Sequence, residues 1–140
     1  MISISLRSKM SSIKEILDAA NKNIESIKQH SGNKYLRNLM EAAYYPDRRF
    51  NLPSGVPPYN INSLHESQTA GQFWQIARKV DAFYREDIKS LLRERAFIGA
   101  LESVSKAEAE ILVAIKEQKL NELYPNLTFG ALRSVGYFVS

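Results

Sequence analysis

Apolar residues recur at helical spacing along most of the chain, and this spacing determines the fold class. Between residues 12 and 29 the apolar positions are Ile13, Ile16, Leu17, Ala20, Ile24 and Ile27. They share one face of an α-helix, which predicts an amphipathic helix over this range. Ser12 and Glu15 have the spacing of a capping box at its start. Because no segment shows a sustained two-residue alternation of apolar and polar side chains, we predict an all-α fold.

Further helices are predicted from the same spacing and from capping residues. We expect them over residues 34–44, over 70–84 with Thr69 as the cap, from Asp87 or Ser90 to about Val104, from Ser105 onward, and over Phe129–Val135. Ser105 and Glu108 form a second capping box, and Gly136 ends the last helix. A chain of 140 residues is long enough to bury one core. The prediction is a compact single-domain bundle of five to six helices over residues 10–140, preceded by a flexible N-terminal extension over residues 1–9.

The longest interruption of the helical pattern is a proline-rich arm over about residues 45–68. Three prolines and a glycine lie within Leu52–Tyr59, which excludes a helix and disfavours a paired strand. The arm also contains apolar and aromatic side chains, namely Phe50, Leu52, Val56, Tyr59, Ile61 and Leu64. A flexible Gly/Ser tether lacks such residues, so we expect the arm to pack on the surface of the bundle. Whether it covers the helices or serves as a docking segment stays open at this point.

The sequence offers little for catalysis or for metal binding. It has no cysteine, which excludes a thiolate metal site and a cysteine nucleophile. Its two histidines are His30, at a predicted helix end, and His65, whose neighbour Glu66 should point away from it. Carboxylate pairs such as Glu108 and Glu110 also diverge on a helix and are interpreted as solvated. We therefore predict no catalytic residue, no metal site and no cofactor.

Positive charge is concentrated in the first third of the chain. Residues 1–50 have nine Lys and Arg against five Asp and Glu, which accounts for the whole net charge of +4. Basic and aromatic side chains are interleaved there, a combination that can hold phosphates and stack on bases. We predict a patch that binds a partner or nucleic acid, formed by Lys34, Arg37, Tyr45, Arg48, Arg49 and Tyr59. The alternative is that these side chains cover the edge of the core with their polar ends in water.

Trp74 lies one position off the apolar stripe of its predicted helix, beside Phe73. This position predicts that the indole packs under the proline-rich arm, as part of the intramolecular structure. The alternative is an exposed hot spot for another protein. Trp74 is therefore included among the candidate partner-binding residues.

Several segments together resemble a small uncharacterised protein family of tailed phages. These segments are Leu52–Tyr59, Arg93–Ile98, Leu101–Ser103, Glu108–Leu112 and Lys116. The family is encoded by T-even-like phages, notably cyanophages and marine myoviruses, and the resemblance extends over about residues 12–138. Its motifs are structural, so no activity or catalytic residue is implied. What the resemblance implies is a phage-encoded accessory protein in the cytoplasm of the host cell.

These features predict a non-enzymatic accessory protein that binds a macromolecule of replication, transcription or host takeover. The partner is a host or phage protein, or nucleic acid bound through the basic and aromatic patch. Two alternatives are an inhibitor of a host enzyme or defence factor, and a virion or self-assembling structural component. No membrane association is expected, because no apolar run approaches 18 residues. The sequence leaves the oligomeric state open.

Overall fold

The computed structural model describes residues 11–138, and the predicted extension over residues 1–9 lies outside them. The α-helices are α2 (Ile13–Lys22), α3 (Lys34–Tyr44), α4 (Glu66–Arg78), α5 (Ser90–Ser103), α6 (Lys106–Glu117), α7 (Leu120–Leu123) and α8 (Phe129–Ser134). Short 3-10 helices are η1 (Ile24–His30), η2 (Pro46–Arg48) and η3 (Val80–Phe83). Over the described range, β-type pairing is limited to an isolated bridge between Asn62 and Ser105. The all-α prediction is confirmed.

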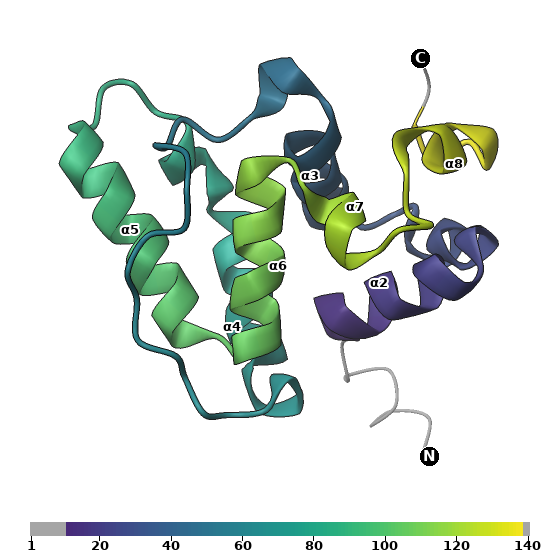
Figure 1. Cartoon of the computed structure of the whole chain (residues 1–140), viewed down its shortest axis with the longest axis horizontal. Coiled ribbons are helices and arrows are strands. Elements are labelled where there is room, and N and C mark those ends of the chain that lie inside the picture. The colour runs from purple at the N-terminus through teal and green to yellow at the C-terminus, as the bar shows by residue number, and fades with distance from the viewer. Residues whose placement is uncertain (1–10, 139–140) are drawn as a thin grey trace.

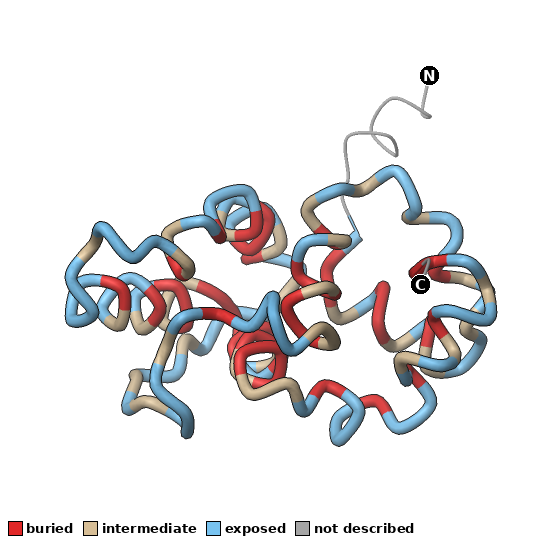
Figure 2. Tube along the Cα trace, turned by 90° about the horizontal axis from the view of Figure 1, so that it is seen from above, coloured by how far each residue is buried: buried red, intermediate tan, exposed pale blue. Residues whose placement is uncertain are grey.

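Helix α6 lies at the centre of the bundle (Figure 1). It packs against α2, α3, α4 and α5, and it buries Ile111, Leu112 and Ile115. The buried apolar residues of the other helices join these in one core. Figure 2 shows that the buried positions face inward and that the exposed positions lie on the outer sides. Among residues 11–138, no helix combines the length and the apolar character needed to cross a bilayer.

Two helix starts follow the predicted capping boxes. The Ser12 hydroxyl accepts a hydrogen bond from the Glu15 N–H (3.0 Å), and the Glu15 carboxylate accepts one from the Ser12 N–H (2.9 Å). Ser105 and Glu108 make the equivalent pair at the start of α6. Each pair provides partners for backbone donors that a helix end leaves free.

The prediction of one helix over residues 12–29 is wrong. Helix α2 ends at Lys22 because Asn23 has an extended backbone, with φ at −149°. The Asn23 side-chain oxygen accepts a hydrogen bond from the Glu25 N–H (3.1 Å) and starts η1. Apolar spacing continues across this break, so the pattern alone could not locate it.

The prediction of a helix over residues 70–84 capped by Thr69 is also wrong. Helix α4 begins at Glu66, where the imidazole Nδ1 of His65 accepts a hydrogen bond from the Ser67 N–H (3.1 Å). Thr69 is a residue of this helix and not its cap, and its side chain is buried. The helix ends at Arg78, and η3 follows it. By contrast, α3 has the predicted bounds of residues 34–44.

The irregular segment between η2 and α4 is residues 49–65, shorter than predicted at both ends. From here on, the arm denotes residues 49–65. It runs beside α5 and reaches the start of α4 (Figure 1). The predicted packing of the arm on the bundle is therefore confirmed.

Candidate functional site

The arm is tied to α5 and α6 through its backbone. The buried Lys116 of α6 donates to the carbonyls of Pro53 (2.9 Å) and Gly55 (2.8 Å). The adjacent Glu117 carboxylate pairs with this ammonium and accepts a hydrogen bond from the Gly55 N–H (2.9 Å). Gly55 has a φ of +93°, which glycine adopts without steric cost. The tight turn of the arm is thus fixed at the C-terminal end of α6.

This anchor also affects the protonation of Glu117. Burial by itself would raise the pKa of the Glu117 carboxyl. The hydrogen bonds from Lys116 and from the Gly55 N–H outweigh burial and hold this pKa below its usual value. Glu117 is therefore ionised at neutral pH and neutralises Lys116.

Two further anchors hold the ends of the arm. At its start, the Arg93 guanidinium donates to the Asn51 carbonyl (3.0 Å). Near its end, the Glu102 carboxylate accepts from the Asn60 N–H (2.8 Å), and the Asn62 amide donates to the Glu102 carbonyl (3.2 Å). The arm is thus an ordered part of the surface with its backbone polar groups partly satisfied by two helices.

Half of the apolar and aromatic side chains of the arm are exposed to solvent, and the other half, Phe50, Leu52 and Tyr59, pack on the core. Among the described residues, six large apolar side chains are between 45% and 68% exposed: Val56, Ile61, Leu64, Leu91, Leu92 and Leu123. The first three belong to the arm, and Leu91 and Leu92 belong to the first turn of α5. We use the name arm–α5 surface for the outer side of the arm and of the first turn of α5, which carries these five residues along its length. Exposed apolar side chains that gather on one side of a protein are typical of a protein-binding site.

A cavity of about 320 Å³ lies between the arm and α5. Its lining is mainly apolar and includes the arm from Leu52 to Pro58, together with Phe97 and Ile98 of α5. Glu94 and Lys116 are the charged residues of the lining. Of the five exposed apolar side chains, Val56 lines this cavity.

The basic and aromatic residues predicted as one patch make different contacts in the structure. Arg37 holds the C-terminal segment: it donates to the Tyr137 carbonyl (2.6 Å), and its guanidinium lies 4.5 Å from the Tyr137 ring centroid. Tyr45 packs on Phe129 and Phe138. These side chains are thus engaged in the fold, as the alternative interpretation expects.

The other predicted patch residues lie elsewhere. Lys34 is exposed beside the Tyr35 ring. Arg48 and Arg49 are exposed at η2, where Arg48 pairs with Glu41 at 3.7 Å. Tyr59 lies on the arm near α6; its pKa is raised by burial and by Glu110, with Lys106 opposing.

The expected position of Trp74 under the arm is wrong. Its indole is buried and packs against the Phe73 ring. The indole N–H donates to the Ser11 carbonyl (2.9 Å), so Trp74 holds the chain where it enters α2. A buried indole offers no surface to a partner.

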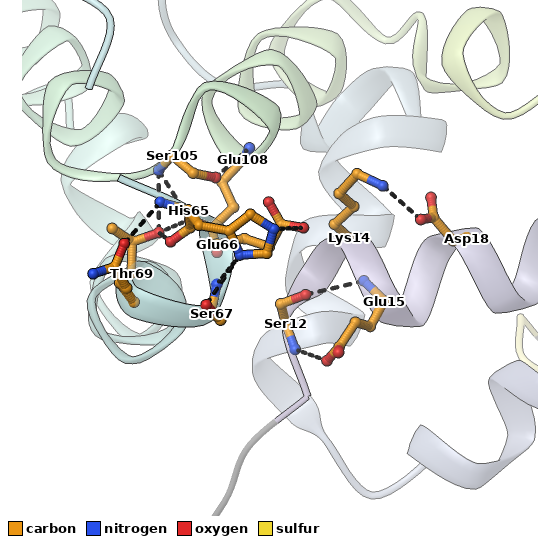
Figure 3. Close-up of polar contacts among 11 residues, drawn as sticks. Ser12, Lys14, Glu15, Asp18, His65, Glu66, Ser67, Thr69, Ser105 and Glu108 are labelled. Atoms are coloured by element: carbon orange, nitrogen blue, oxygen red, sulfur yellow. Dashed lines mark hydrogen bonds and ion pairs between the residues drawn. The ribbon is translucent and has the colours of Figure 1, made fainter. Parts of the chain in front are cut away.

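His65 and Glu66 do not diverge as expected. Figure 3 shows the imidazole between Glu66 and Ser67, with Nε2 3.3 Å from the Glu66 carboxylate. Because Nδ1 accepts from the Ser67 N–H, the ring proton belongs on Nε2. Both ring nitrogens thus contact residues of the first turn of α4. The His65 side chain is nevertheless 67% exposed to solvent.

The interpretation of Glu108 as solvated is also wrong. Glu108 is fully buried and accepts hydrogen bonds from the Thr69 hydroxyl and the Ser105 N–H (Figure 3). Its other carboxylate oxygen has no hydrogen-bond partner. The sequence predicted that Glu108 caps the start of α6, but it could not predict the contact with α4 that buries the side chain. Across the described chain, no group of three or more acidic or histidine side chains could hold a metal ion.

Comparison with known proteins gives one result. The sequence profile of a family of unknown function, DUF6433, matches residues 11–122. The chain belongs to the DUF6433 family. No curated protein and no solved structure matches the chain significantly. The DUF6433 match runs from the entry to α2 into α7 and includes the arm, α5 and the Lys116 anchor.

Proposed function

We propose that this DUF6433 protein is a non-enzymatic accessory protein that binds another protein through the arm–α5 surface. The observation that carries the proposal is the distribution of exposed apolar side chains: five of the six large ones described belong to the arm and α5. Burial of apolar area on binding contributes roughly 25 cal/mol per Å² before the costs of association. These side chains therefore provide a favourable contact area that the fold itself does not use.

The order of the arm supports the same proposal. A segment that is fixed before binding loses little conformational entropy when a partner docks. The arm is fixed by Lys116, Glu102 and Arg93 through its backbone, which leaves Val56 and Ile61 directed to solvent. A rigid backbone with outward apolar side chains is suited to recognition.

A protein partner is favoured over nucleic acid. Nucleic-acid domains gather basic side chains in a stripe that follows the phosphates. Here Arg37 is bound to Tyr137, Arg48 pairs with Glu41, and Arg85 pairs with Asp87. The setting in a phage-infected cell, and hence a host or phage protein as the partner, rests on the sequence resemblance alone.

Site-specific photo-crosslinking tests this proposal. A photoreactive phenylalanine analogue placed at Val56 should give a protein adduct of defined mass in lysate of the source cells. The same analogue at Leu123, the exposed apolar residue outside the arm–α5 surface, serves as the matched control. A specific adduct at Val56 that is lost in Ile61→Ser/Leu91→Ser supports the proposal. Equal adducts at both positions, or none at Val56, would contradict it.

A further inference from the structure

The cavity between the arm and α5 combines an apolar lining with one carboxylate that pairs with no residue of the described chain. Glu94 of α5 is partly buried and lines the cavity. No lysine, arginine or histidine among residues 11–138 lies within ion-pair distance of its carboxylate. Its carboxylate also accepts no hydrogen bond from the arm, unlike the carboxylate of Glu102.

The neighbouring cations are engaged elsewhere. Lys116 also lines the cavity, but Glu117 neutralises its ammonium, which is directed to the arm carbonyls. The guanidinium of Arg93, one position before Glu94, is directed to the carbonyls of Asn51, Arg85 and Ile88. Of the two charged residues that line the cavity, Lys116 is paired with Glu117, whereas Glu94 has no ion-pair partner among residues 11–138.

We propose that this cavity binds a lysine or arginine side chain of the partner protein. Such a side chain has a methylene stem that can pack along Val56, Pro57 and Ile98, and a cation that can reach Glu94. A pairing at a partly buried carboxylate is screened less by salt than one in open solvent. The cavity volume of about 320 Å³ suits one long side chain. This inference rests on the proposed function and specifies the chemistry of the partner.

A titration with two small probes tests the assignment without the partner. n-Hexylamine at neutral pH stands for the lysine side chain, and 1-hexanol has the same stem without the charge. Amide chemical shifts of Gly55, Phe97 and Ile98 report binding to the full chain. We expect n-hexylamine to bind about fivefold more tightly than 1-hexanol, the factor that a weak ion pair contributes.

Two variants locate the source of this preference. Glu94→Gln should bind both probes equally, whereas Glu122→Gln, which changes an exposed carboxylate on α7, should keep the fivefold preference. Equal binding of the two probes by the wild-type chain would overturn the assignment, as would a preference that survives in Glu94→Gln. Self-association of the wild-type chain that Glu94→Gln abolishes would overturn the partner assignment and give the cavity to a second copy.

The two proposals can fail separately. If crosslinking at Val56 succeeds and the probes bind equally, the surface binds a protein but the cavity does not select a cation. If the probes bind as expected and no adduct forms at Val56, the cation site exists and the proposed protein contact is wrong.

Discussion

The arm and the C-terminal segment, residues 124–138, both contain irregular backbone, yet they attach to the bundle in opposite ways. The C-terminal segment inserts its side chains into the core: Tyr124, Leu127, Leu132, Tyr137 and Phe138 are buried. In the arm, Phe50 is the one buried residue of 49–65. Leu52 and Tyr59 are partly buried against the core, and the backbone of the arm is held by polar side chains of α5 and α6.

The two segments therefore differ in what their side chains can do: those in the core stabilise the fold, whereas exposed ones can contact a partner. Side chains that fill the core contribute to folding and are lost to a partner. A segment held by its carbonyls and N–H groups keeps its apolar side chains accessible. The comparison agrees with the proposal that the arm–α5 surface binds a partner, whereas the C-terminal segment completes the core.

The largest expected effect is a cavity in the C-terminal segment. Leu132→Ala removes a fully buried side chain and should lower the free energy of unfolding by about 3 kcal/mol. Ile61→Ala on the arm should change it by less than about 0.5 kcal/mol, since Ile61 is exposed. Urea denaturation measures both. Losses of similar size would remove the distinction between the two segments.

The second effect concerns the anchor of the arm. Lys116→Met removes the ammonium that binds the Pro53 and Gly55 carbonyls and should cost about 2 kcal/mol of stability. The amides of residues 53–60 should then exchange with solvent faster. Lys119→Met, at an exposed position, is the matched control and should change neither quantity. Unchanged exchange in Lys116→Met would show that other contacts hold the arm.

The third effect is a loss of stability at alkaline pH. Burial raises the pKa of Tyr84 and of Tyr137 to about 12, and it also raises the pKa of Tyr44 and of Tyr124. Below pH 10 these tyrosines are protonated in the folded and the unfolded chain, so their contribution is fully present. Between pH 10 and 12 the unfolded chain releases protons that the folded chain keeps.

Stability should therefore fall over this window by about 1.4 kcal/mol per pH unit for each tyrosine held protonated. Three of these tyrosines, at positions 44, 124 and 137, lie in the C-terminal segment or bond to it. Urea denaturation at pH 8, 10 and 11 checks the slope. A free energy of unfolding that stays constant to pH 11 would contradict the burial of these side chains.

The smallest effect on the core is the removal of single hydroxyl groups. The Tyr44 hydroxyl donates to the Leu127 carbonyl, so Tyr44→Phe should cost about 1 kcal/mol. The buried Tyr137 hydroxyl has no hydrogen-bond partner, so Tyr137→Phe should be neutral or slightly stabilising. Thermal unfolding of the two variants provides the comparison. An equal loss in both would indicate a bond to the Tyr137 hydroxyl.

The sequence predicted the helices that local signals start and stop. The Ser12 and Ser105 boxes and the bounds of α3 were readable because capping needs only residues within one turn. The start of α4 was missed because histidine is an uncommon N-cap residue. The residues expected at this position are Ser, Thr, Asp and Asn.

Features that depend on distant residues could not be predicted. Glu108 is buried against Thr69 of α4, and the guanidinium of Arg37 is engaged by the carbonyl of Tyr137 in the C-terminal segment. The arm was recognised from its prolines, but its anchor at Lys116 joins residues more than 60 positions apart. A lysine on a helix gives no local sign that it will be buried against two carbonyls.

The central claim is that the three exposed apolar side chains of the arm, Val56, Ile61 and Leu64, are not needed by the fold. The most direct test is the free energy of unfolding of Val56→Ser/Ile61→Ser/Leu64→Ser, measured by urea denaturation against the wild-type chain. Because all three side chains are exposed, the account predicts a change of less than about 0.5 kcal/mol. A loss of about 2 kcal/mol or more would show that these side chains stabilise the protein itself, and it would contradict the claim that they are kept for a partner.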